Sequence, residues 1–238
     1  MNIDGSIAFV TGANRGLGAA FTEALLERGA AKVYAAVRRR PNTITDPRVV
    51  PVRLDLTDPD SIVAAAQQAS DATLVINNAG ISTRTPILGD EAGLRQELEV
   101  NYLGPIAVSR NFAPVLEANG GGALVNVLSV LSWVTLPTTA GYSAAKSALW
   151  SATNALRLTL AEQNTLVVAV HVGYMDTDMA AAITTPKANP RAVADATLDA
   201  VQVGDHEVLA DDLSRKVRAG LSGPLGGLYP SLIAPTAA

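Results

Sequence analysis

Short apolar runs rich in Val, Ile and Leu alternate along the chain with longer segments whose apolar residues recur at helical spacing. Such runs, separated by helices, are typical of strands that are buried on both faces of a parallel sheet. The pattern predicts an α/β fold with a doubly wound, mostly parallel seven-stranded sheet and helices on both faces. The seven runs lie near residues 7–10, 32–37, 49–54, 73–76, 123–128, 166–172 and 207–210.

Prolines and helix-start residues mark the connections between these elements. Two prolines in residues 38–47 leave little room for a helix and predict a loop there. Thr57 and Pro59 predict the start of the next helix, with Thr57 as its N-cap. Because the chain contains no repeat, low-complexity segment or interdomain linker, we expect one domain over residues 1–238.

A glycine-rich turn joins the first apolar run to the first helical segment. Gly12, Gly16 and Gly18 would let backbone N–H groups and the dipole of the following helix approach a pyrophosphate. Their Gly-x3-Gly-x-Gly spacing differs from the commoner Gly-x-Gly-x2-Gly pattern, and the Gly-Lys-Ser/Thr ending of a P-loop is missing. By themselves the glycines fit either a dinucleotide site or ordinary tight turns and helix caps.

Tyr142 and Lys146 form the most informative pair of polar residues. On a helix their four-residue spacing puts both side chains on one face, with Cβ atoms about 5–6 Å apart. A nearby ammonium favours the phenolate, and a phenol with an ordinary pKa of about 10 needs that help to exchange protons near neutral pH. The alternative is a surface pair at helical spacing. Ser129 precedes Tyr142 by thirteen residues and ends a predicted strand, where open α/β sheets bind ligands.

Five motifs occur in one order: the glycine turn, the Asn-Asn-Ala-Gly segment of residues 77–80, Asn101, Ser129 and the Tyr142–Lys146 pair. In this order the chain resembles the single-domain, Rossmann-type short-chain dehydrogenases/reductases over nearly its whole length. The resemblance implies that Tyr142 is the general acid/base and that Lys146 lowers the pKa of Tyr142 and binds the nicotinamide ribose. It further implies that Ser129 binds the substrate oxygen and that Asn101 holds a water linked to Lys146.

The resemblance also implies a nicotinamide dinucleotide as cofactor. Two positions depart from the family pattern: Leu128, where many members have a second serine, and Val172, where proline is usual. Neither change removes a catalytic group, although loss of the proline would slightly loosen the segment that follows. The residues expected to bind the cofactor are Gly12, Asn14, Arg15, Gly16, Leu17, Gly18, Arg38, Asp55, Leu56, Asn78, Ala79, Gly80, Tyr142, Lys146, Gly173, Met175 and Thr177.

Charge at the end of the second predicted strand bears on which dinucleotide is bound. Val37 stands where an acidic residue would bind both ribose hydroxyls of NAD. Arg38, Arg39 and Arg40 follow it, and Arg15 lies in the glycine turn. Because guanidinium groups suit a 2′-phosphate, these positions favour NADP(H) over NAD(H). The alternative is that the arginines form a solvated loop.

Composition argues against several other functions. The net charge of −4 disfavours nucleic acid as a partner. With no Cys and two His, the chain has no disulfide framework or thiol catalysis, and a Cys/His zinc site is excluded. Neither a leader-peptide pattern nor an apolar run of membrane-spanning length is found. We therefore expect a cytoplasmic protein that binds no metal and no membrane.

The loops at the carboxyl edge of the sheet are expected to select the substrate. They are residues 81–90, 130–141 and 174–190, and the last of these is named the substrate loop here. No basic residue lies between Ser129 and Tyr142, so an apolar ketone, aldehyde or secondary alcohol is favoured. The expected pocket residues, each of which could equally belong to the core, are Trp133, Leu136, Tyr174 and Met179.

The C-terminal segment, residues 221–238, is more apolar than disordered tails usually are, so it either covers the substrate site or packs on another subunit. Family members commonly form dimers or tetramers, and Trp150, Leu156 and Leu160 would face either such a partner or the sheet. We expect an NADP(H)-dependent oxidoreductase that acts on a small-molecule carbonyl or alcohol substrate as a homodimer or homotetramer. The alternative is a non-catalytic dinucleotide-sensing protein on the same scaffold.

Overall fold

A computed structural model describes residues 1–38 and 45–230, and these residues contain one seven-stranded sheet. Neighbouring strands are all parallel, in the order β3-β2-β1-β4-β5-β6-β7. The α/β fold predicted from the apolar runs is confirmed. The strands are β1 (Ile7–Thr11), β2 (Lys32–Val37), β3 (Val49–Arg53), β4 (Leu74–Asn77), β5 (Gly122–Val127), β6 (Thr165–His171) and β7 (Glu207–Leu209).

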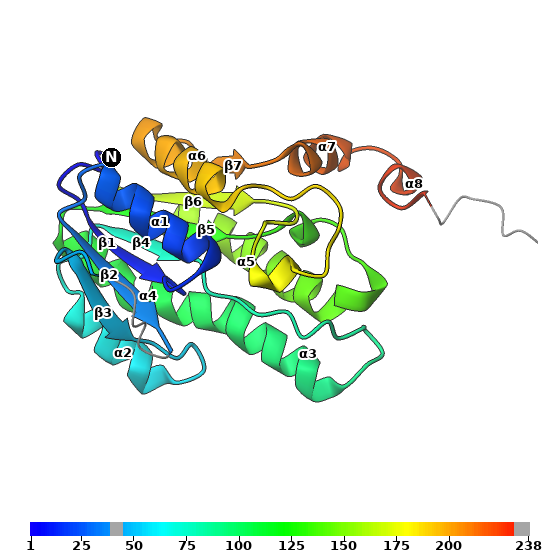
Figure 1. Cartoon of the computed structure of the whole chain (residues 1–238), viewed down its shortest axis with the longest axis horizontal. Helices are drawn as coiled ribbons and strands as arrows, with labels where there is room; N and C mark the ends of the chain where they lie inside the picture. Colours follow the sequence, from blue (N-terminus) through cyan, green and yellow to red (C-terminus); the bar gives the residue numbers. More distant parts are fainter. Residues whose placement is uncertain (39–44, 231–238) are drawn as a thin grey trace, which may run out of the picture.

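Helices cover both faces of the sheet (Figure 1). The longer ones are α1 (Gly16–Glu27), α2 (Pro59–Gln68), α3 (Glu91–Leu98), α4 (Gly104–Ala118), α5 (Ala140–Thr159) and α6 (Pro190–Val203). Successive strand residues point to opposite faces, so Val10 packs in the core under α1 and α6, whereas Phe9 packs under α2 and α4. There the ring of Phe9 contacts Phe112 of α4, with centroids 4.4 Å apart.

The strand order reverses beside β1, because β1 pairs with both β2 and β4. In open α/β sheets ligands bind beyond the carboxyl ends of the strands at such a reversal. Gly12 follows the end of β1, Asn78 follows β4, Leu128 and Ser129 follow β5, and Val172 follows β6. The motifs singled out in the sequence therefore lie along one edge of the sheet.

The C-terminal part of the described chain extends past this edge (Figure 1). It consists of α7 (Asp212–Gly220) and the single-turn helix α8 (Leu225–Leu228). Just after α8, the Tyr229 hydroxyl accepts a hydrogen bond from the Thr135 N–H at 3.0 Å. This bond ties the end of the described chain to the segment between β5 and α5.

The start of α2 differs by one residue from its predicted position. Asp58, and not Thr57, is the N-cap, since its carboxylate accepts hydrogen bonds from the N–H groups of Asp60 at 3.1 Å and Ser61 at 3.3 Å. Thr57 is held instead by Asp55, to which it donates through its N–H at 3.0 Å and its hydroxyl at 2.8 Å. Because the Thr57 hydroxyl is bonded to Asp55, it does not cap the helix.

Trp150 and Leu156 of α5, and Leu160 directly after it, were expected to face either a partner subunit or the sheet. Leu156 and Leu160 pack against the core between the sheet, α2 and α4, and Trp150 packs against the small cluster around Leu128. Of the two predicted orientations they adopt the one that faces the sheet, while Leu158 is 80% exposed. The loop predicted over residues 38–47 falls mostly on 39–44, outside the described residues.

Candidate active site

A cavity of about 1840 Å³ opens at the carboxyl edge of the sheet. Its walls come from the glycine turn, the segments after β4, β5 and β6, the start of α5, and the C-terminal helices. Ligand pockets usually measure about 300–1,000 Å³, so this cavity exceeds the size of a site for one small molecule. Except for Gly18, every residue predicted to bind the cofactor lines it.

The glycine turn forms one end of the cavity in a conformation that side chains would disturb. Gly12 and Gly16 have φ angles of +68° and +52°, in the left-handed region that favours glycine. A methyl group at Gly18 would overlap the carbonyl oxygen of Gly12, so α1 begins directly against the turn. Arg15 is the N-cap of α1 without a side-chain capping bond, which leaves the first N–H groups of the helix available to an anion.

Thr11 locks this turn to the segment that follows β4. Its hydroxyl oxygen accepts hydrogen bonds from the N–H groups of Asn78 and Ala79, both at 2.9 Å. The Asn78 Nδ2 donates in return to the Thr11 carbonyl at 2.8 Å. Sequence reasoning missed this residue, because a threonine at a strand end has many other uses and only the pairing of β1 with β4 brings it to Asn78.

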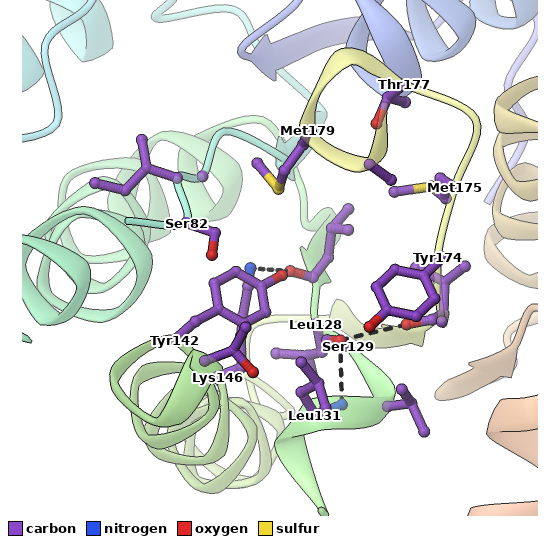
Figure 2. Close-up of a pocket in the computed structure, with 18 of the residues that line it drawn as sticks. Ser82, Leu128, Ser129, Leu131, Tyr142, Lys146, Tyr174, Met175, Thr177 and Met179 are labelled. Atoms are coloured by element: carbon purple, nitrogen blue, oxygen red, sulfur yellow. Dashed lines mark hydrogen bonds between the residues drawn. The ribbon is translucent and has the colours of Figure 1, made fainter. Parts of the chain in front are cut away.

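The first half of α5 brings Tyr142 and Lys146 to the cavity wall, where Ser129 meets them (Figure 2). The Lys146 Nζ lies 5.7 Å from the centre of the Tyr142 ring and donates a hydrogen bond to the Val127 carbonyl at 2.7 Å. The Ser129 hydroxyl donates to the Val172 carbonyl over 3.4 Å, a long bond that a better acceptor could replace. Ser132, three residues further on, is buried and does not line the cavity.

Burial shifts the pKa values of both Tyr142 and Lys146. Burial of the phenol in the cavity wall raises the pKa of Tyr142 to about 12, an effect that the Ser129 hydroxyl reduces and the Glu97 carboxylate strengthens. Burial also lowers the pKa of Lys146 to about 8, since its ammonium is only 4% exposed. In the free protein, desolvation of the phenol therefore outweighs the acidifying effect expected from Lys146, and Tyr142 is protonated at neutral pH.

Asn101 completes the set of predicted catalytic residues. It lies in a π-helical turn, η1 (Glu99–Leu103), between α3 and α4, and its side chain is fully buried. Its Oδ1 accepts from the Ile81 N–H and its Nδ2 donates to the Ile81 carbonyl, both at 2.9 Å. A Cβ atom built on Gly80 would lie 2.9 Å from that Oδ1 and 3.9 Å from the Lys146 Nζ, so both residues flank Gly80.

The segment after β6 closes the cavity above the glycine turn. Gly173, Met175 and Thr177 all line it, and the Gly173 N–H donates to Asp211 at 2.7 Å. Asp211 also caps α7 through the Ser214 N–H at 2.7 Å, so one carboxylate holds two walls together. The bond gives this segment an anchor even though Val172 replaces the family's proline.

Of the four arginines expected near the cofactor, Arg15 and Arg38 belong to the described residues. Arg15 and Arg38 line the cavity beside Val37, and Arg39 and Arg40 lie outside the described residues. The Arg15 guanidinium pairs with Asp178 at 2.9 Å, and both side chains are more than 70% exposed. An exposed pair of this kind contributes little to stability, so an anion could draw Arg15 away.

A family model described as short chain dehydrogenase matches residues 6–188 of the chain. The chain belongs to the short-chain dehydrogenase/reductase family. The resemblance carried by the five ordered motifs is therefore confirmed, and the protein is an oxidoreductase by family.

Solved and curated relatives of this short-chain dehydrogenase/reductase agree with that assignment. A short chain dehydrogenase from Burkholderia cenocepacia, solved in complex with NADP, is 43% identical, with a TM-score of 0.93 over 99% of this chain and 100% of that one. NADPH-bound carbonyl reductase from chicken fatty liver is 26% identical, with a TM-score of 0.74 over 83% and 91%. Cis-4-hydroxycyclohexanecarboxylate dehydrogenase of Sinomonas cyclohexanicum is 34% identical over 74% of this chain and 76% of that protein. Two other curated relatives are longer, and the chain spans 43% and 65% of their lengths.

The substrate side of the cavity contains three of the four residues predicted for it: Leu136, Tyr174 and Met179. Trp133, the fourth, lies outside the lining and stacks on His171, with ring centroids 3.7 Å apart. The described end of the C-terminal segment forms part of the lining, from Gly220 to Pro230, so it covers this side of the cavity. In Figure 2, Tyr142, Ser82, Met179 and Tyr174 surround one space.

Two basic residues not named in the sequence analysis reach the cavity, one from the predicted substrate-selecting loop 81–90 and one from α7. Arg84, from the loop after β4, has a left-handed φ of +58°, and Lys216 comes from α7. Both are exposed to solvent at the cavity mouth. No local signal marks Lys216, because only the fold brings α7 to this cavity.

Two further features are missing from the described ranges, 1–38 and 45–230. No helix there is long and apolar enough to cross a membrane. The same residues contain no group of three His, Cys, Asp or Glu side chains arranged to hold a metal ion.

Proposed function

We propose that this protein is an NADP(H)-dependent oxidoreductase that transfers hydride reversibly between nicotinamide and an apolar ketone or aldehyde, or a secondary alcohol. The observation that carries the proposal is the meeting of Tyr142, Lys146 and Ser129 at the wall of a cavity whose other end is the glycine turn. Carbonyl reduction needs a proton donor beside a bound hydride donor, and this cavity offers room for both.

Tyr142 would protonate the carbonyl oxygen during reduction and accept the hydroxyl proton during oxidation. The phenol holds its proton at neutral pH, which the first role requires, while its raised pKa makes release of that proton depend on stabilisation of the phenolate. Ser129 would exchange its long bond to Val172 for one to the substrate oxygen and stabilise the developing negative charge. Lys146 would stabilise the phenolate by its charge, and Asn101 would hold a water that links Lys146 to solvent.

The residues present fit a nicotinamide dinucleotide, which supplies the hydride when bound. The left-handed glycines and the uncapped start of α1 suit a pyrophosphate. The segment from Gly173 to Thr177 would receive the carboxamide, and Lys146 would bind the nicotinamide ribose. Val37 in place of an acid, with Arg15 and Arg38 beside it, supports NADP(H) over NAD(H), as does the NADP bound to the 43% identical relative.

The cavity lining supports a largely apolar substrate. Its apolar side chains include Leu131, Leu136, Met179, Ile183, Leu213, Val217 and Leu228. Arg84 and Lys216 at the mouth would also suit a carboxylate placed away from the reacting carbon, as in the substrate named for the Sinomonas relative. The chemistry that we propose is therefore reduction of an alicyclic or aryl ketone, with or without a remote carboxylate.

The test is loss of NADPH absorbance with a panel of cyclic ketones, oxo acids, aryl ketones and aldehydes, with NADH in parallel. Turnover that requires NADPH and is lost in Tyr142→Phe supports the proposal. Preference for NADH would contradict the argument from Val37, Arg15 and Arg38. Tight NADPH binding without turnover of any compound would favour the dinucleotide-sensing alternative. Homodimer or homotetramer formation and a cytoplasmic location stay predictions, the first testable by sedimentation.

A further inference from the structure

A buried carboxyl group lies beside Tyr142 and has no part in the chemistry described above. Glu97, near the end of α3, is 0% exposed and is the one acidic side chain buried within the described residues. Its Oε1 accepts a hydrogen bond from the Thr83 N–H at 2.7 Å, whereas its Oε2 has no hydrogen-bond partner. Burying a polar oxygen without a partner costs stability, and this cost makes the position a candidate for a functional role.

The unpartnered oxygen faces the helix that carries the catalytic tyrosine. A methyl group at Gly141 would overlap Oε2 of Glu97, so this oxygen packs directly over the Gly141 backbone. Gly141 lies in the first turn of α5 and immediately precedes Tyr142. Glycine is thus the residue that lets the carboxylate approach, and any side chain at that position would push Glu97 away.

The other oxygen belongs to a set of bonds that hold residues 81–85 in place. Asn101 holds the first of these residues through its main chain, and Glu97 holds Thr83. The Gly141 N–H donates to the Thr85 carbonyl at 3.3 Å, which joins the same loop to α5. Ser82, between the first two anchors, lines the same cavity as Tyr142 (Figure 2).

We propose that Glu97 is a positioning residue of this enzyme, because its carboxylate joins the loop at Thr83 to the first turn of α5 and presents one oxygen to the backbone that carries Tyr142. The inference rests on the proposed function, in which Tyr142 is the acid. It assigns to Glu97 two effects: a fixed distance between the loop and α5, and a negative charge close enough to act on the phenol.

The charge acts against ionisation of the phenol. The charged groups near Tyr142 are Lys146 from α5 itself and Glu97 from α3, and the hydroxyl groups are those of Ser129, after β5, and Ser82, which lines the same cavity. Negative charge disfavours a phenolate, and Glu97 accordingly raises the pKa of Tyr142. Glu97 therefore keeps Tyr142 protonated to higher pH and widens the range in which it can donate a proton.

The experiment is Glu97→Gln, which removes the charge but keeps an oxygen that can accept from Thr83. Reduction is followed as kcat/KM against pH, with Glu99→Gln, an exposed position two residues on, as the matched control. The alkaline limb of the profile should move down by about one pH unit in Glu97→Gln and stay in place in the control. Coinciding limbs for the wild type and Glu97→Gln would overturn the proposal.

A second measurement needs no turnover. The ultraviolet difference between each protein and its Tyr142→Phe counterpart follows ionisation of Tyr142, which should begin at lower pH in Glu97→Gln. If the wild type reduces no carbonyl, the proposed function fails, and this titration alone then decides the role of Glu97. Should Glu97→Gln not fold, Gly141→Ala is compared in the wild type and in Glu97→Ala. If the Glu97 carboxylate packs on Gly141, the Gly141→Ala change should lower the Tm less in the Glu97→Ala background than in the wild type. An equal decrease in Tm in both backgrounds would refute the contact.

Discussion

The buried ammonium of Lys146 should weaken the free protein at neutral pH and not strengthen it. Burial lowers its pKa from the usual 10.5 to about 8. Between these values the unfolded chain carries the proton and the folded protein does not, so stability rises as pH rises through this window. Below pH 8 the folded protein bears the full cost of the charge. Replacing Lys146 with Met removes that cost together with the hydrogen bond to Val127.

The two contributions can be separated by their pH dependence. The pKa difference corresponds to a charge-burial cost of about 3 kcal/mol at pH 7, falling to about 1 kcal/mol at pH 10. Loss of the hydrogen bond leaves the Val127 carbonyl unpaired and costs about 1–3 kcal/mol at every pH. At pH 7, Lys146→Met should therefore be as stable as the wild type or slightly more stable. From pH 7 to pH 10 the free energy of unfolding of Lys146→Met should drop by about 2 kcal/mol relative to that of the wild type.

Urea unfolding of both proteins at pH 7 and pH 10 measures this change directly. Lys216→Met, at an exposed position of α7, is the control for loss of a lysine without loss of a buried charge. A stability difference between Lys146→Met and the wild type that does not change with pH would refute the reasoning. Lys146→Met should also lose most of its reductase activity, so the same residue would be retained for function at a cost in stability.

Three further results are expected. Tyr142→Phe should lower kcat about 1,000-fold in the reductase assay while NADPH binding, followed by calorimetry, is retained. Gly18→Ala should weaken NADPH binding and lower the free energy of unfolding by about 1–3 kcal/mol in urea, because its methyl group overlaps the Gly12 carbonyl; an unchanged midpoint and affinity would contradict this. Burial lowers the pKa of His171 to about 4 from 6.5, so the unfolded chain binds its proton first and stability should fall by about 2 kcal/mol between pH 7.5 and pH 5. His171→Gln should flatten this fall in urea midpoints, and a fall as steep as that of the wild type would contradict the assignment to His171.

The positions of the strands and of the polar site residues could be predicted because they depend on local patterns. Buried strands need continuous apolar runs, and a phenol and an ammonium on one helix face need a four-residue spacing. Tyr142, Lys146 and Ser129 are therefore recognisable from the sequence alone. The miss at Thr57 was also local, since two neighbouring residues both suit an N-cap and only the bonds to Asp55 decide between them.

Nonlocal contacts had to come from the tertiary structure. Glu97 resembles any acidic residue on a helix until α3 packs against α5 and brings it to Gly141. Trp133 has the composition of a pocket residue, yet stacking on His171 keeps it out of the lining. Lys216 of α7 could not be placed from its sequence neighbours either. The sequence by itself determined the sheet and predicted the glycine turn and the Tyr142–Lys146 pair, since each is encoded in short spacings. Only the tertiary structure decided which side chains surround them, because chain segments far apart in sequence meet through packing and carry no mark of their partners.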